Sequence, residues 1–266
     1  PLTNLSSAMN KVAEGDFETQ IETESRLEAI QDIYTNFNLM VKELGATETL
    51  QTDFVSNVSH EIKTPITAID GYATLLQNTE NIDEVENEYI EKILFNTKRL
   101  SELVSNILLL SKVDNKAIQA KKTTYRLDEQ IRQSIVLLEP KWSAKEIDFD
   151  VDMDEVEYTG DESLMFHVWN NLLDNAIKFS PENGLIRMKL ERADSKITFT
   201  IEDEGCGISD EEKKHIFNKF YQSDSSHKSE GNGLGLALVK NILTLCSGEI
   251  SVTDGKNGGA RFEVIL

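Results

Sequence analysis

Apolar residues recur in the first part of the chain at the seven-residue spacing of packed helices. Counting from Leu27, the first apolar position of each repeat is occupied by Leu27, Tyr34, Val41, Glu48, Val55, Ile62, Ile69 and Leu76. The second position, three residues further on, is occupied by Ile30, Phe37, Leu44, Gln51, Val58, Pro65 and Tyr72. Only Glu48, Gln51 and Pro65 interrupt this pattern. It therefore predicts one helix of about fifty residues in a bundle or coiled coil.

Two further helices are predicted on either side of this long one. Residues 1–13 form a short amphipathic helix with an apolar stripe of Leu2, Leu5, Met9 and Val12, and a polar, extended connector follows over residues 16–25. Residues 84–113 form the other helix, with a seam of Ile90, Ile93, Thr97, Leu100, Val104 and Ile107. The long helix and this one form an antiparallel hairpin with more apolar surface than one hairpin covers. We therefore expect a homodimer through residues 1–113, with a four-helix bundle.

After residue 124 the pattern changes to alternating helices and strands, and residues 114–123 are polar and predict a linker. The predicted helices cover residues 128–145, 163–179 and 233–246, with Asp128 and Asp161 at the starts of the first two. The predicted strands cover residues 147–151, 186–190, 197–201, 250–253 and 260–266, and a short turn joins the second and third as a hairpin. These elements predict an α+β sandwich, a sheet covered on one face by helices. The glycine-rich stretch from 204 to 232 has a length that is typical either of a functional lid or of a disordered segment.

Composition narrows the possible partners. A formal net charge of −20 over 266 residues argues against binding of nucleic acid, which needs a basic surface. The same charge repels phosphate, so any phosphate site must be built locally from backbone N–H groups, a metal and a few lysines. Cys206 and Cys246 form no CxxC pair, which suits a reducing compartment. No run of roughly 18 apolar residues is present, so none of these residues is expected to span a membrane. Because the sequence begins at Pro1 without Met, we expect it to be part of a longer protein.

The stretch Ser59–Pro65 (SHEIKTP) offers the first candidate for chemistry. His60 lies opposite the apolar seam of the repeat, so it is predicted to be exposed, unlike a buried structural histidine. Exposure fits a functional imidazole, but surface histidines are common, and the repeat alone favours an ordinary surface histidine. Pro65 removes the helix hydrogen bond to the Glu61 carbonyl and would let the helix bend beside His60.

Three polar residues share one face of the predicted helix 163–179. Asn171, Asn175 and Lys178 are spaced four and three residues apart, which keeps them within an arc of about 60°. Two amides and a lysine on one face are suited to a metal ion and a polyphosphate. A plain solvated face is the alternative interpretation of the same pattern.

Two glycine-rich segments lie at the ends of the long loop. Asp203 ends a predicted strand, and Gly205 and Gly207 after it would let the backbone approach a ligand. The second segment comprises Gly231, Gly233, Leu234 and Gly235. It opens the last predicted helix, whose unpaired N–H groups favour phosphate. Its GxGxG spacing, outside any βαβ unit, is neither the dinucleotide fingerprint nor a Walker A loop.

Five segments occur in an order that resembles the sensor histidine kinases of two-component systems. They are HEIKTP around His60, NLLDNAIKF from Asn171, DEGCGI from Asp203, IFNKFY from Ile216 and GNGLGLAL from Gly231. They resemble the H, N, G1, F and G2 boxes of that family, and the resemblance covers essentially the whole chain. It implies a dimerisation and histidine phosphotransfer domain over residues 46–113. It also implies a catalytic ATP-binding domain over residues 124–266, of the GHKL type shared with gyrase, Hsp90 and MutL.

Residues 1–45 resemble a HAMP domain, the parallel four-helix signal relay of membrane receptors. The resemblance is carried by Pro1-Leu2, the Gly15-Asp16-Phe17 turn, the heptads and Phe37-Asn38-Leu39-Met40. It implies that a transmembrane and sensor segment precedes Pro1, and that this chain is the cytoplasmic portion of a cell-membrane protein.

The resemblance also implies roles at the phosphoacceptor. His60 would attack the γ-phosphate of ATP through a ring nitrogen, and Glu61 would hold or deprotonate the other nitrogen. Thr64 matches the family's residue for positioning water when a response regulator is dephosphorylated. The other implied partner is the receiver domain of that regulator, which would accept the phosphoryl group on an aspartate.

By the same resemblance, Asp203 would bind the adenine amino group and Asn175 would ligate Mg²⁺. Asn171 and Lys178 would lie near the phosphates. The backbone would approach the nucleotide at Gly205, Gly207, Gly231, Gly233, Leu234 and Gly235, and Phe217 and Phe220 would anchor the loop on the core. Phosphoryl transfer needs mainly positioning and charge stabilisation, which such a set supplies.

One position departs from the family pattern, and two other functions stay open. Gln222 stands where many relatives have an arginine that reaches the γ-phosphate, and His227 and Lys228 are candidates to replace it. A conformational scaffold without kinase activity would be expected to have lost His60, Asn175 or Asp203. An Hsp90- or MutL-like ATPase would not need the His60 hairpin. Because all these residues are present together, we favour the kinase.

Overall fold

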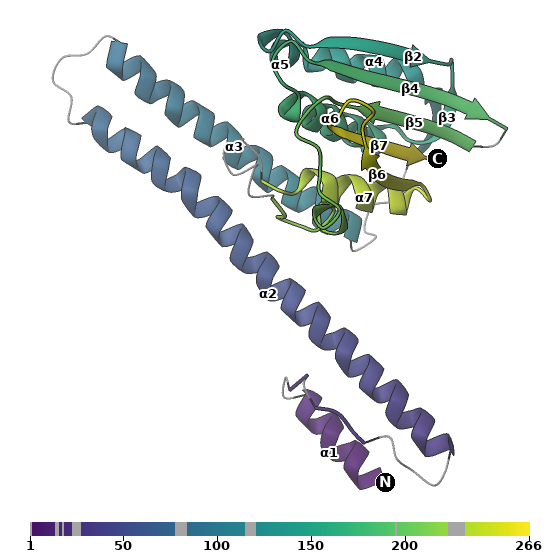
Figure 1. Cartoon of the computed structure of the whole chain (residues 1–266). Helices are drawn as coiled ribbons and strands as arrows, with labels where there is room; N and C mark the ends of the chain where they lie inside the picture. The colour runs from purple at the N-terminus through teal and green to yellow at the C-terminus, as the bar shows by residue number, and fades with distance from the viewer. Residues whose placement is uncertain are drawn as a thin grey trace. The chain divides into compact units, whose positions relative to one another are not determined.

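The computed structural model describes residues 2–13, 16–17, 19–22, 28–77, 84–114, 121–194, 196–222 and 232–266 (Figure 1). The chain forms two compact units, Pro1–Thr64 and Pro65–Leu266, and each is described by itself. Within the described residues, no helix has the length and apolar character needed to cross a membrane.

The first unit packs the helix α1 (Leu2–Ala13) against the N-terminal part of α2 (Glu28–Gln77). Its core contains Ala8, Ile21, Tyr34, Phe37 and Val41, with Leu5, Val12, Phe17 and Ile30 packed around it. Tyr34, Phe37 and Val41 are the predicted seam of the heptad repeat, which is thereby confirmed in this part of α2. The side chains of Glu48 and Gln51 lie outside the described residues.

The predicted stripe of α1 was partly wrong. Met9 is 49% exposed, whereas Ala8 is 6% exposed and lies in the core. Ile21 of the connector is buried in the same core as Ala8. Asn38 fastens the connector to α2: its Oδ1 accepts from the Ile21 N–H (2.9 Å) and its Nδ2 donates to the Ile21 carbonyl (2.8 Å).

The predicted helical hairpin is formed by α2 and α3 (Glu84–Asp114), and the predicted turn at 78–83 lies outside the described residues. Near that turn, the rings of Tyr72 and Tyr89 lie 5.9 Å apart. Large apolar side chains of the hairpin are exposed in the single chain: Ile66, Leu75, Ile90, Leu94, Phe95, Val104 and Leu108. Ile90 and Val104 belong to the predicted seam of residues 84–113. Among the side chains of α3 that the structure describes, those that are buried are Leu103, Leu110 and Val113, and this helix packs on α7.

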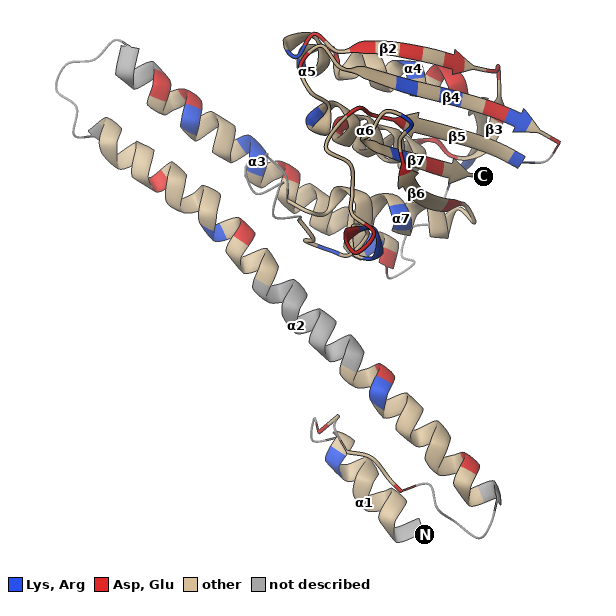
Figure 2. Cartoon of the chain, in the orientation of Figure 1, with Lys and Arg blue, Asp and Glu red and all other residues tan. Residues whose placement is uncertain are grey.

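The remainder of the second unit is built on a five-stranded sheet. Its strands are β2 (Asp148–Met153), β4 (Leu185–Ala193), β5 (Lys196–Glu202), β6 (Glu249–Asp254) and β7 (Ala260–Ile265). Their order is β2-β4-β5-β7-β6, with β2 and β4 parallel and the other neighbours antiparallel. The edge strand β2 exposes Asp148, Asp150 and Asp152 (Figure 2). Such charges discourage pairing with another sheet edge.

Helices cover one face of this sheet, as predicted (Figure 1). They are α4 (Leu127–Leu137), α5 (Glu139–Ala144), α6 (Glu162–Phe179) and α7 (Gly235–Leu245), and a 3-10 turn, η1 (Glu212–Lys214), lies in the long loop. The central helix α6 packs against both α4 and α7. Its fully buried Trp169 meets Phe199 of β5 edge to face, with ring centroids 5.0 Å apart.

The sequence prediction was wrong at the start of this domain. The predicted helix 128–145 is two helices, because Pro140 lies in the first turn of α5 and has no N–H to continue α4. Asp128 does not cap a helix; it lies inside α4, where it accepts from Arg126 (2.8 and 2.7 Å) and from the Val156 N–H (3.2 Å).

Two short strands were missed. β1 (Lys122–Arg126) pairs with β3 (Glu157–Asp161) in a separate antiparallel sheet. β1 therefore begins inside the stretch predicted as a linker. Both strands are rich in polar residues, so their apolar alternation is too weak to signal a strand.

Candidate active site

His60 is exposed on α2, as its place opposite the seam predicted. Thr64 lies one turn further along, and its hydroxyl donates to the His60 carbonyl (3.1 Å). Pro65 is buried, and α2 continues through it to Gln77 although proline offers no N–H to the Glu61 carbonyl. The imidazole is therefore open to another molecule on a helix whose backbone pairing is altered beside it.

Asp203 follows the last residue of β5 and is 4% exposed. Its Oδ1 accepts from the N–H groups of Gly205 (2.9 Å) and Ala260 (3.2 Å), and its own N–H donates to the Ala260 carbonyl (3.0 Å). Burial raises the pKa of this carboxyl, and the two N–H donors oppose that rise. Both side-chain hydrogen bonds found in the described residues use Oδ1, which leaves Oδ2 to accept from a ligand.

Two glycines explain the close packing around Asp203. A Cβ on Gly205 would overlap the Phe179 carbonyl at the end of α6, so only glycine lets the strand end meet this helix. A Cβ on Gly259 would overlap the carbonyl of Asp203 itself. The turn between β6 and β7 is therefore part of the site. None of the five sequence segments contains Gly259.

One residue of the predicted polar face of α6, Asn171, lies beside the start of α7. Asn171, Asn175 and Lys178 are all half-buried, and the Asn171 Nδ2 donates to the His167 carbonyl (2.7 Å). A Cβ on Gly235 would lie 2.6 Å from the Asn171 Oδ1. The structure therefore brings Asn171 to the N-terminus of α7, where unpaired N–H groups favour an anion.

The loop before α7 is held by an unusual pair of backbone conformations. Gly233 has a φ of 65° and Phe220 has a φ of 63°, and the Phe220 N–H donates to the Gly233 carbonyl (2.8 Å). A Cβ on Gly233 would lie 2.6 Å from the Phe220 carbonyl carbon. Leu234, just before α7, is fully buried. The F and G2 segments thus meet at this point.

Other predicted site residues have fewer contacts or lie outside the description. Gly207 has a φ of 73°, which favours glycine, and the Lys240 ammonium lies 5.6 Å from the centre of the Phe217 ring. Gly231, His227 and Lys228 lie outside the described residues. Gln222 is half-buried.

One lysine that no motif marked caps the C-terminal end of α6. The Lys145 ammonium donates to three carbonyls at the end of that helix, those of Ile177 (2.9 Å), Lys178 (2.7 Å) and Ser180 (3.0 Å). These groups lack partners inside the helix, and a cation there also suits the helix dipole. A lysine more than thirty residues away in sequence gives no pattern from which this contact can be predicted.

Two protein-family models match separate segments of the chain. Residues 50–116 match the family model "His Kinase A (phospho-acceptor) domain", and residues 160–266 match "Histidine kinase-, DNA gyrase B-, and HSP90-like ATPase". The Heme sensor protein HssS of Staphylococcus epidermidis is 34% identical over 253 residues, which cover 95% of this chain and 55% of HssS. The chain thus spans about half the length of the curated relatives that it matches.

Solved structures agree with this assignment. The catalytic domain of histidine kinase ThkA is 30% identical with a TM-score of 0.50, and the match covers 55% of this chain and 95% of that domain. Histidine kinase ThkA in complex with response regulator protein TrrA is 26% identical with a TM-score of 0.66, covering 83% of this chain and 63% of that one. The phosphoacceptor match contains His60, and the ATPase match contains Asn171, Asp203 and Gly235. This chain therefore belongs to the sensor histidine kinase family.

Proposed function

We propose that this chain transfers the γ-phosphoryl group of ATP to His60 and then to an aspartate of a response regulator. The observation that carries the proposal is the combination of an exposed His60 with a buried Asp203 carboxylate that keeps one oxygen available. An ATPase of another class would need the second feature but not the first.

The nucleotide would be held by three parts of the catalytic domain. The Oδ2 of Asp203 would accept from the adenine amino group. The N-terminus of α7, with Gly233, Leu234 and Gly235, would receive the phosphates, and Gly231 belongs to the same proposed loop. Asn171 and Lys178 would contact the phosphates from α6. The support for this arrangement is the approach of Asn171 to Gly235.

The residues present suit Mg²⁺ held largely by the nucleotide. Among the described residues, no group of three or more His, Cys, Asp or Glu could hold a metal ion. Mg²⁺ commonly takes one or two protein oxygens together with waters and substrate phosphates. The side-chain oxygen of Asn175 would supply the protein ligand. The ion would offset charge on the phosphates, and the chain would position them.

The transfer itself is a displacement at phosphorus. A ring nitrogen of His60 would form a bond to the γ-phosphorus as the bond to the bridging oxygen breaks, and ADP would leave. Glu61 would hold or take the proton of the other ring nitrogen and so raise the nucleophilicity of the first. The phosphoryl group on His60 would then pass to the carboxylate of the regulator.

Three further assignments belong to this proposal. Thr64 would position a water that dephosphorylates the regulator: its hydroxyl donates to the His60 carbonyl and would accept from the water through an oxygen lone pair. The exposed apolar residues of the hairpin would be covered in a homodimer. Residues 1–45 would be a HAMP relay, below a membrane segment in the longer protein.

Incubation with γ-labelled ATP and Mg²⁺ tests the proposal. The expected label is covalent, acid-labile and alkali-stable, as for a phosphorylated imidazole, and it is absent from His60→Gln. Asp203→Asn should also lose the label, because the base would no longer be held. A wild-type chain that hydrolyses ATP without acquiring label would favour an ATPase, and a chain that does neither would favour a scaffold.

A further inference from the structure

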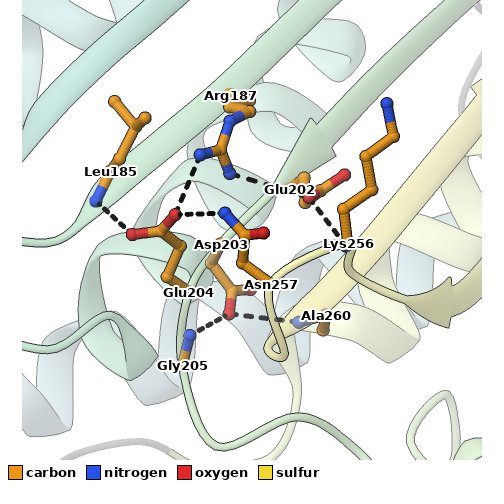
Figure 3. Close-up of polar contacts among 9 residues, drawn as sticks. All are labelled: Leu185, Arg187, Glu202, Asp203, Glu204, Gly205, Lys256, Asn257 and Ala260. Atoms are coloured by element: carbon orange, nitrogen blue, oxygen red, sulfur yellow. Dashed lines mark hydrogen bonds and ion pairs between the residues drawn. The ribbon is translucent and has the colours of Figure 1, made fainter.

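A polar network lies directly behind Asp203 (Figure 3). Arg187 of β4 is the register partner of Glu202 at the end of β5, so the two side chains share a face of the sheet. The Arg187 Nη2 donates to the Glu204 Oε1 (2.9 Å), and its Nη1 lies 3.7 Å from the Glu202 Oε1. Glu204 also accepts from the Leu185 N–H (3.3 Å). One guanidinium therefore links the two glutamates on either side of Asp203.

The same glutamates hold the turn between β6 and β7. The Lys256 N–H donates to the Glu202 Oε1 (2.9 Å), and the Asn257 Nδ2 donates to the Glu204 Oε1 (3.1 Å). This turn leads directly to Ala260, whose N–H donates to the Asp203 Oδ1. Any movement of the turn would therefore change one of the two hydrogen bonds that orient the Asp203 carboxylate.

The positive charge of Arg187 balances the negative charges of the neighbouring glutamates. Glu202, Asp203 and Glu204 are three consecutive acids, and the side chains of Glu202 and Glu204 are only 9% and 25% exposed. In the described part of the chain, the ion pairs of both glutamates go to Arg187. Figure 3 shows the ammonium of Lys256 pointing away from them. Asn257 and Arg187 lower the pKa of Glu204, so the network is held with this carboxylate ionised.

We propose that Arg187 is a positioning residue for recognition of the nucleotide base. By neutralising Glu202 and Glu204 it would hold the β6–β7 turn against Asp203, and so aim the free carboxylate oxygen at the adenine amino group. This inference rests on the proposed binding of ATP. It adds a residue from β4 and a turn from β6–β7, neither of which lies in the five sequence boxes.

Loss of Arg187 should weaken recognition of the adenine base more than binding of the phosphates. The glutamates would repel each other and Asp203, and the turn would shift with the Ala260 N–H. The groups proposed to bind the phosphates are Asn171 and the start of α7. Among the described residues, they form no hydrogen bond with this network. We therefore expect ATP to bind roughly tenfold more weakly, since one charge-assisted hydrogen bond has about that worth. The rate at saturating ATP should change little.

Inosine triphosphate separates base recognition from general damage, because it has a carbonyl in place of the adenine amino group. Binding of ATP and ITP with Mg²⁺ would be measured for wild type, Arg187→Met and Arg187→Lys, together with KM and kcat of autophosphorylation. Arg187→Met should lose most of the preference for ATP over ITP, and Arg187→Lys should recover part of it. Lys189→Met is the matched control, since Lys189 lies on the same strand and face and pairs with Glu191. It should leave the preference unchanged.

The outcomes separate the two proposals. A wild-type chain that shows no preference for ATP over ITP would overturn the proposed base contact of Asp203 and this inference with it. This inference alone would be overturned if Arg187→Met keeps the wild-type preference for ATP, or if it weakens the binding of ATP and of ITP equally. If Arg187→Met does not fold, Asn257→Ala removes one exposed contact of the same network. It should shift the preference in the same direction by a smaller factor, and no shift would count against the network.

Discussion

Removal of the Lys145 ammonium should destabilise the catalytic domain through the end of α6. Its three hydrogen bonds reach the carbonyls of Ile177, Lys178 and Ser180 at 2.7 to 3.0 Å. A hydrogen bond to a charged group contributes about 1.5–3 kcal/mol to stability. Because Lys145 is half-buried, water would replace part of the three hydrogen bonds in the variant. We expect Lys145→Met to lower the free energy of unfolding by about 2 kcal/mol. The melting temperature should then fall by about 4–8 °C.

Tryptophan fluorescence suits this measurement, because the two tryptophans of the chain are Trp142 on α5 and Trp169 on α6, two of the helices that cover the sheet. Lys141→Met is the matched control: Lys141 pairs with Asp174, also on α6, but its side chain is 60% exposed. Exposed pairs of this kind contribute little to stability. Equal effects of the two substitutions, or no measurable effect of Lys145→Met, would refute the argument that the three hydrogen bonds to the end of α6 stabilise the fold.

Three more substitutions test other parts of the structure. Gln130→Leu leaves the buried Trp169 Nε1 without its acceptor at 2.8 Å, so chemical denaturation should show a loss of about 1–3 kcal/mol. A loss near zero would mean that water replaces Gln130. Gly71→Ala adds a methyl group inside α2, where a Cβ would have no other atom within 4 Å. Alanine should therefore stabilise the helix by about 0.5–1 kcal/mol, measured by thermal unfolding followed by circular dichroism. A lowered melting temperature would contradict this. Thr64→Val should abolish regulator dephosphorylation and preserve labelling of His60; loss of both activities would contradict the role of Thr64.

Periodic patterns predicted the elements that depend on neighbouring residues. The heptads fixed the core positions Tyr34, Phe37 and Val41, and they placed His60 on the exposed side of α2. Alternation predicted the hairpin of β4 and β5, and Asp161 does precede α6 and cap it. In these segments one face of a helix or strand is buried along its length, so the burial repeats at a readable period.

Contacts between distant segments gave no such signal. Lys145 and Arg187 act on residues that lie elsewhere in the chain, and the turn at Gly259 meets Asp203 only because β7 pairs with β5. The start of the catalytic domain was mispredicted for a related reason. Asp128 has the residue type of a cap, but Arg126 and the distant Val156 N–H are its partners.

The central claim is that His60 receives the phosphoryl group from ATP bound at the Asp203 site. Its most direct test is to locate the phosphoryl group by mass spectrometry under alkaline conditions after brief incubation with ATP and Mg²⁺. The account predicts phosphate on the His60 imidazole in wild type and in Lys189→Met, and none in Asp203→Asn. Phosphate on any other residue, or on His60 at the wild-type rate in Asp203→Asn, would contradict it.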